Sequence, residues 1–193
     1  NSKDIHAVRI SNASADLLLG CDNITSATGE NLRYIHRNKT QAVINSHYVA
    51  TASFTLDTSS PSHIDEIEQD LQKHIHAEKM DTLDATRIAT KLMGDAIATN
   101  MFILGYAIQK GLIPVELSSI EKAIELNGVA VNANKQAITW GRLMAYNPDE
   151  VIEIINGQIE KGVDIPLSKT TDDIIHTRYQ LLCDYQNKEY ADR

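Results

Sequence analysis

The stretch that decides the fold is Gly94–Leu112, GDAIATNMFILGYAIQKGL, near the middle of a chain of 193 residues. After a polar opening, apolar residues follow one another with almost no polar face, which is typical of a helix covered on all sides. The run is shorter than the roughly 18 to 20 residues of a membrane span, and Thr99 and Asn100 interrupt it. We therefore predict a core or interface helix over residues 96–110.

Two glycines predict where another element packs closely against this helix and where the helix ends. Gly105 lies in mid-helix, where glycine costs about 1 kcal/mol relative to alanine, so we expect another element to approach the backbone closely there. Gly111 is expected to end the helix, because glycine readily adopts the left-handed conformation of a helix C-cap.

The residues before this helix alternate between strand and helix patterns. The apolar run Ala15–Cys21 predicts a central, fully buried strand. The other expected elements of this part are a strand over 5–10, a helix over 22–37, a strand over 42–49, a helix over 64–78, a strand over 80–83 and a helix that Asp84 begins and Gly94 ends. Strand followed by helix and strand indicates parallel βαβ units with the helices packed against the sheet.

The residues after the central helix carry only helical patterns. Pro148 suits the first position of a helix, and Asp149 and Glu150 beside it are favourable in a first turn. We therefore predict an α/β fold: a three-layer, Rossmann-like, mainly parallel sheet followed by a helical C-terminal part. The expected division of the chain is 1–147 and a helical extension over 148–193.

Composition excludes several classes of partner and site. The formal net charge is −8 with a pI near 5.3, so the chain has little electrostatic attraction to nucleic acid or to an anionic membrane, and we expect neither as a partner. Only Cys21 and Cys183 are present, far apart in the sequence. Two such cysteines support no disulfide framework, zinc site or iron–sulfur cluster. A reducing, cytoplasmic setting is the one that we predict.

Candidate binding residues lie where predicted strands end and the central helix begins. In open α/β sheets, ligands bind outside the carboxyl ends of the strands, and residues 45–47, beginning with Asn45, interrupt or end the strand predicted over 42–49. Gly94 and Asp95 precede the central helix, whose first N–H groups could hold an anion. The alternative for each residue is a cap or a turn. No nucleotide-binding, hydrolase or metal-ligand motif occurs in the sequence, so we predict no catalytic and no metal-binding residue.

Four blocks of sequence, in the same order, resemble the gamma-type domain of 2-oxoacid:ferredoxin oxidoreductases, most of all the fused bacterial indolepyruvate:ferredoxin oxidoreductases. The blocks are DLLLGCD at 16–22, GDAIATNMFILGYAIQKGL-IP at 94–114, AIELNGVAVNAN at 123–134 and WGR at 140–142. By this resemblance residues 1–147 are a gamma-type domain, and 148–193 lead into the next domain. The family's Gly-rich opening strand, turn and helix is absent, so we expect the chain to begin partway through the domain and its sheet to lack that first unit.

The resemblance implies an enzyme that decarboxylates a 2-oxoacid on thiamine diphosphate and Mg²⁺, passes electrons through iron–sulfur clusters to ferredoxin and forms an acyl-coenzyme A. We expect this chain to hold none of these cofactors and to be inactive alone. Because the family's gamma domain contributes to the coenzyme A site, the loop with Gly94, Asp95 and Asn100 is expected near coenzyme A, together with Asn45. The expected partners are the thiamine-binding domains, ferredoxin through the parent enzyme, and further copies of the chain in a homo-oligomer.

Two other functions remain open at this point. The chain could be an independent nucleotide- or coenzyme-A-binding module, although such a module needs a Gly-rich phosphate loop. It could also be a helical interaction domain whose apolar helix is a dimer seam.

Overall fold

A computed structural model describes residues 10–47, 63–160, 175, 179 and 188. The chain divides into two compact units, Asn1–Gly157 and Gln158–Arg193, and the first contains the sheet and the central helix. The predicted strand over 5–10 lies outside the described residues, as does most of the predicted extension beyond residue 160. The boundary expected between residues 147 and 148 stays a prediction.

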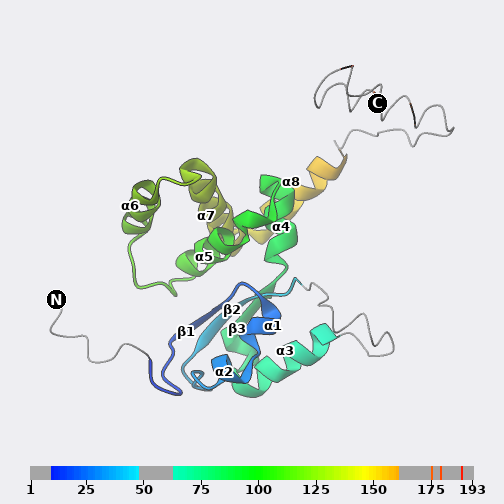
Figure 1. The fold of residues 1–193 in the computed structure, drawn as a ribbon. Coiled ribbons are helices and arrows are strands. Elements are labelled where there is room, and N and C mark those ends of the chain that lie inside the picture. Colours follow the sequence, from blue (N-terminus) through cyan, green and yellow to red (C-terminus); the bar gives the residue numbers. More distant parts are fainter. Residues whose placement is uncertain (1–9, 48–62, 161–174, 176–178, 180–187, 189–193) are drawn as a thin grey trace. The chain divides into compact units, whose positions relative to one another are not determined.

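The sheet of the described residues consists of three parallel strands, β1 (Leu17–Gly20), β2 (Gln41–Asn45) and β3 (Met80–Leu83), in the order β1-β2-β3 (Figure 1). The central strand is β2, and it is buried from Ala42 to Asn45. Among the described strands Ala15–Cys21 therefore does not form the central one, and the prediction that it is fully buried is wrong. Leu17 to Leu19 are only half-buried, because β1 is an edge strand of this sheet and only β2 pairs with it along its length.

One face of the sheet is covered by α1 (Asn23–Ser26), α2 (Gly29–Leu32), α3 (His63–His74) and the short 3₁₀ helix η2 (Ala77–Lys79). Ala42 and Ile44 of β2 point to this face and pack with Leu71 and Ile75. The single helix expected over 22–37 is instead two one-turn helices. The chain becomes extended at Thr28, whose hydroxyl donates to the carbonyl of Thr25 at 3.0 Å and so competes with helix continuation.

The opposite face is covered by α4 (Ala85–Met93), the 3₁₀ turn η3 (Ala96–Ala98) and α5 (Thr99–Gln109). Val43 of β2 joins Ile88, Phe102 and Ile103 in one buried cluster on this side. As predicted, Asp84 caps α4 by accepting from the N–H of Arg87 at 3.0 Å, and Gly94 ends it with a φ of 82°. Helices on both faces of a parallel sheet make three layers, which confirms the predicted fold class.

Helices α6 (Leu117–Asn127), α7 (Val131–Tyr146) and α8 (Pro148–Glu160) follow α5. The close neighbour expected at Gly105 is α7, because a Cβ at Gly105 would overlap the backbone of Ile138. The contact is reciprocal, since a Cβ at Gly141 of α7 would overlap the carbonyl oxygen of Phe102. Gly111, with a φ of 74°, follows the end of α5 as predicted.

The central helix is less fully covered than its sequence predicts. Phe102, Ile103 and Ala107 are buried, but Met101 and Leu104 are only half-buried. Part of this apolar helix therefore lacks cover within the described part of the chain. None of the helices described is long and apolar enough for a membrane span.

Substituting Gly141 by alanine tests the close crossing of α5 and α7. The added methyl group would meet backbone rather than a flexible side chain, so the helices must separate. We expect Gly141→Ala to lower the free energy of unfolding by about 1 to 3 kcal/mol or more, as overpacking does, in urea denaturation followed by circular dichroism.

Gly29→Ala is the matched control. Gly29 is also helical, and nothing lies within 4 Å of a Cβ placed there. Alanine should leave stability unchanged or raise it by up to about 1 kcal/mol. If Gly141→Ala and the unsubstituted chain had the same midpoint of urea denaturation, the close crossing of α5 and α7 would be contradicted.

Candidate functional site

The carboxyl ends of the three parallel strands lie at one edge of the sheet, where open α/β folds bind their ligands. Strand β2 ends at Asn45, and Ser46 and His47 follow it. Asp22 follows the end of β1, and Asp84 follows the end of β3. This edge, together with the start of α4, is the candidate functional site.

Asn45 is the structural centre of this edge. Its amide nitrogen donates to the carbonyl of Cys21 at 2.9 Å and to the hydroxyl of Thr86 at 2.8 Å, while its oxygen accepts from the N–H of Ala85 at 3.1 Å. Only 3% of Asn45 is exposed. Both amide protons are used, so the side chain ties β1, β2 and α4 together. A ligand contact for Asn45 stays a prediction, and a ligand would have to displace bonds that the fold uses.

The hydrogen bonds continue from Asn45 to the loop that opens the central helix. The hydroxyl of Thr99 lies 3.4 Å from that of Thr86 and donates to the carbonyl of Ala96 at 2.6 Å. The network therefore connects Asn45 to η3, the turn that follows Gly94 and Asp95. It brings these predicted site residues into one region of the fold.

The loop itself is exposed at all three of its predicted binding residues, Gly94, Asp95 and Asn100. Asp95 accepts from the N–H of Ile97 at 2.9 Å, which is the capping role named above as the alternative. The N–H of Thr99 bonds to Ala96 within the 3₁₀ turn. Because these N–H groups already have acceptors, the turn is a poorer anion site than the sequence predicts. Within the described residues Asn100 makes no side-chain hydrogen bond, and it is exposed, so its carboxamide could meet a ligand.

A histidine–aspartate pair at the same edge was not predicted from the sequence. The Nδ1 atom of His47 lies 3.2 Å from a carboxylate oxygen of Asp84, and both side chains are about one-third exposed. The register of β2 and β3, which pairs Asn45 with Leu83, places the residues after these strands together. The pair could have been predicted only with knowledge of this register, which the sequence patterns did not provide. Donation from Nδ1 to Asp84 would select the tautomer in which Nε2 of His47 is a hydrogen-bond acceptor.

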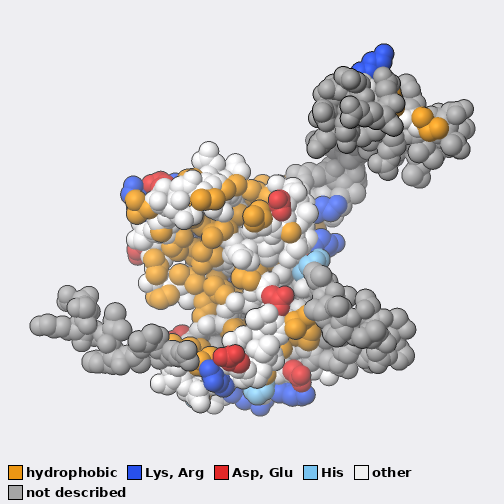
Figure 2. Space-filling model, in the orientation of Figure 1, with side chains coloured by type: hydrophobic (Ala, Val, Ile, Leu, Met, Phe, Trp, Pro, Cys, Tyr) orange, Lys and Arg blue, Asp and Glu red, His pale blue; other side chains and the backbone are white. Residues whose placement is uncertain are grey.

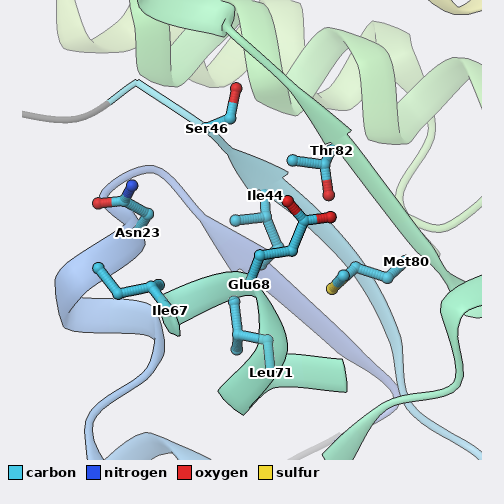
Figure 3. A pocket seen from close by; sticks show the side chains of 8 residues that line it. All are labelled: Asn23, Ile44, Ser46, Ile67, Glu68, Leu71, Met80 and Thr82. Atoms are coloured by element: carbon cyan, nitrogen blue, oxygen red, sulfur yellow. The ribbon is translucent and has the colours of Figure 1, made fainter. Parts of the chain in front are cut away.

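A small cavity lies beside the edge, on the α3 face of the sheet (Figure 3). Its volume of about 10 Å³ is roughly what a single water needs. Asn23, Ser46 and Thr82 bring polar groups to it, and Ile67 and Leu71 are among its apolar lining. A space of this size takes a water-sized group, so it is not the binding site for a larger ligand.

Metal-ligating side chains do not cluster in the described part of the chain. No group of three or more His, Cys, Asp or Glu side chains suitable for a metal occurs in residues 10–47 and 63–160 or at the three described positions beyond them. Burial raises the pKa of the Cys21 thiol, which disfavours the thiolate that nucleophilic attack or metal binding needs.

Sheet, flanking helices and polar edge together define a Rossmann-like α/β domain that continues into a layer of helices. The family model described as pyruvate ferredoxin/flavodoxin oxidoreductase matches residues 1–144, and the chain belongs to this family. No curated protein and no solved structure matches the chain. The match confirms the resemblance to the gamma-type domain of a 2-oxoacid:ferredoxin oxidoreductase, whereas the fused, indolepyruvate-specific form stays a prediction.

Thr86→Val tests whether the hydrogen-bond network holds this edge together. Valine keeps the shape of threonine but removes the hydroxyl that Asn45 and Thr99 approach. One amide proton of the buried Asn45 then lacks a partner, which should lower the free energy of unfolding by about 1 to 3 kcal/mol.

Thr86→Ser retains the hydroxyl and is the matched variant. In urea denaturation, Thr86→Ser should lower the free energy of unfolding clearly less than Thr86→Val does. Equal losses for the two variants would mean that the methyl group of Thr86, rather than its hydroxyl, matters.

Proposed function

We propose that this chain is the non-catalytic gamma domain of a cytoplasmic indolepyruvate-type 2-oxoacid:ferredoxin oxidoreductase. The parent enzyme would convert a 2-oxoacid oxidatively to an acyl-coenzyme A with ferredoxin as electron acceptor. The observation that carries the proposal is the family match over residues 1–144. The indolepyruvate-type assignment is supported only by the resemblance of the four sequence blocks, taken together, to the fused form of these enzymes.

The parent enzyme's thiamine diphosphate, Mg²⁺ and iron–sulfur clusters would be held by other domains. The donor set of this chain supports that division, because its described residues contain no cluster of metal ligands and its half-buried Cys21 has a raised pKa. Its role would be to pack against the thiamine-binding domains and to contribute to the coenzyme A site.

The loop with Gly94, Asp95 and Asn100 is the part that we assign to coenzyme A. Asn100 supports this assignment best, because it is exposed and its carboxamide has no hydrogen-bond partner among the described residues. The carboxylate of Asp95 would repel phosphate groups, so the loop suits the uncharged amide-bearing arm of coenzyme A better than its phosphates. Asn45 would act on the ligand through the network that positions the loop.

The exposed apolar side chains of the helical layer support packing against a partner. Ile97 is 83% exposed, Leu126 78% and Val129 65%, and Figure 2 shows apolar side chains gathered over the region of α5, α6 and α7. Surfaces of this kind mark protein interfaces more often than isolated apolar residues do. We assign this surface to the thiamine-binding domains.

The same surface supports the alternative of a dimerising module. Light scattering of the isolated chain separates the two, because a dimer seam gives a concentration-dependent dimer. A docking surface for other domains gives a monomer that gains a partner only when those domains are added.

Asn100→Ala in the complete oxidoreductase tests the coenzyme A assignment. We expect the KM for coenzyme A to rise about threefold to tenfold, as for the loss of one or two hydrogen bonds, with kcat and the KM for the 2-oxoacid unchanged. Because Asn100 is exposed and makes no side-chain hydrogen bond to another described residue, the melting temperature should not fall.

Asn132→Ala is the matched control, since Asn132 is also an exposed helical asparagine that makes no side-chain hydrogen bond in the described part of the chain. Its KM for coenzyme A should equal that of the unsubstituted enzyme. The same KM in the Asn100 variant would remove Asn100 from the coenzyme A site.

The isolated chain should show no 2-oxoacid oxidoreductase activity and bind neither thiamine diphosphate nor iron. The sequence carries no thiamine-diphosphate motif, and the described residues contain no group of three or more His, Cys, Asp or Glu side chains that could hold a metal ion. Metal analysis of the purified chain and calorimetric titration with thiamine diphosphate check this, and stoichiometric iron would overturn it.

A further inference from the structure

A groove runs along one face of α7 and begins beside the Gly94 loop. Its first lobe, with a volume of about 510 Å³, lies between Leu92 and Met93 at the end of α4 and the residues Lys135, Gln136, Thr139 and Trp140 of α7. Met93 directly precedes Gly94. This volume is within the roughly 300 to 1,000 Å³ of small-molecule sites.

A second lobe of about 360 Å³ adjoins the first, because Thr139 lines both. It lies between Gln109 at the end of α5 and Arg142, Leu143 and Tyr146 of α7. Residues 135, 139, 142 and 146 are spaced so that they lie on one face of a helix. The two lobes therefore follow one stripe of α7 for about 16 Å, at 1.5 Å per residue, and together suit an elongated ligand.

The two lobes differ in chemistry. In the first, Leu92, Met93 and Trp140 supply half-buried apolar surface, and Gln136 offers an exposed carboxamide that bonds to none of the described residues. Lys135 is a poor phosphate ligand there, because it already binds Glu125 at 2.7 Å. This lobe suits an uncharged, partly apolar arm.

The second lobe suits an anion and a flat ring. Arg142 donates to the side chain of Gln109 at 3.1 Å, and no carboxylate of the described residues neutralises its charge. Tyr146 is 77% exposed and presents an aromatic ring beside it. A guanidinium group can bind a phosphate, and an exposed aromatic ring beside it can stack on a nucleobase.

We propose that the groove along α7 binds coenzyme A, with the adenine ring on Tyr146, a phosphate at Arg142 and the pantetheine arm against Trp140 and Met93. This inference rests on the proposed use of coenzyme A by this domain. It adds the residues that hold the phosphates and the base, which the Gly94 loop with its Asp95 carboxylate is poorly suited to hold. The pantetheine end then lies toward the loop, next to Met93.

The chain's only tryptophan, Trp140, provides the measurement. Coenzyme A titrated into the 193-residue chain should change the Trp140 emission saturably, and equilibrium dialysis should give the same Kd. Pantetheine, which has neither base nor phosphate, should change the same emission with lower affinity. Raising the salt concentration should weaken the binding of coenzyme A but not of pantetheine.

Three substitutions on the exposed side of α7 and one control assign the contacts. Arg142→Gln should weaken coenzyme A about tenfold and remove most of the salt dependence, whereas Arg33→Gln, on the remote α2 side, should not. Tyr146→Ala should weaken coenzyme A about tenfold, and Tyr146→Phe should not, because phenylalanine still stacks. Pantetheine binding should be the same in all four variants.

Either of two results would overturn the inference. One is coenzyme A binding, seen by dialysis, that leaves the Trp140 emission and the affinities of the Arg142 and Tyr146 variants unaltered. The other is no binding up to millimolar coenzyme A, because the groove lies wholly within this chain. These results would reject the assignment of the groove without rejecting the proposed function. The proposed function is tested separately, by the KM for coenzyme A of the Asn100 variant in the complete enzyme.

Discussion

The backbone contact between α5 and α7 is the constraint on which the rest of the structure depends. Gly105 lies against the backbone of Ile138, and Gly141 lies against that of Phe102, so the two helices cross with no side chain between them at these points. This crossing turns the buried face of α5, with Phe102 and Ile103, toward the sheet, where Val43 completes the same cluster. One helix is thereby fixed between the sheet on one side and α7 on the other.

A second constraint, polar rather than apolar, positions the start of that helix. Asn45 accepts from the first N–H of α4 and donates to Thr86, and Thr86 is next to Thr99 at the start of α5. Buried polar groups are costly unless they are paired, and here the pairs join segments that are distant in the sequence. The apolar cluster fixes how deep α5 lies, and the network fixes where its exposed loop lies on the edge of the sheet.

Much of this arrangement follows from the sequence, and the exceptions have physical reasons. Local signals predicted the last strand, the Asp84 and Gly94 ends of α4, and a close neighbour at Gly105, because capping and the lack of a Cβ act within a few residues. The sequence did not predict which strand is central, since an apolar run such as Leu17 to Leu19 suits an edge strand packed on one side as well as a buried one. The pairing of His47 with Asp84 depends on the register of β2 and β3, which no local pattern contains.

The candidate site divides in the same way between local and tertiary information. Gly94 and Asp95 were predicted from their place before an apolar helix, and the fold uses both as caps. Arg142 and Tyr146 could not be recognised as candidate binding residues from the sequence. The groove that they line is formed by α7 together with the ends of α4 and α5, so it depends on how these three helices pack. The Gly105 and Gly141 contacts set the distance between α5 and α7, and so they also set the width of the second lobe. A change that separated these helices would therefore alter the groove and the core together, which links the packing of the domain to the ligand surface that we assign to it.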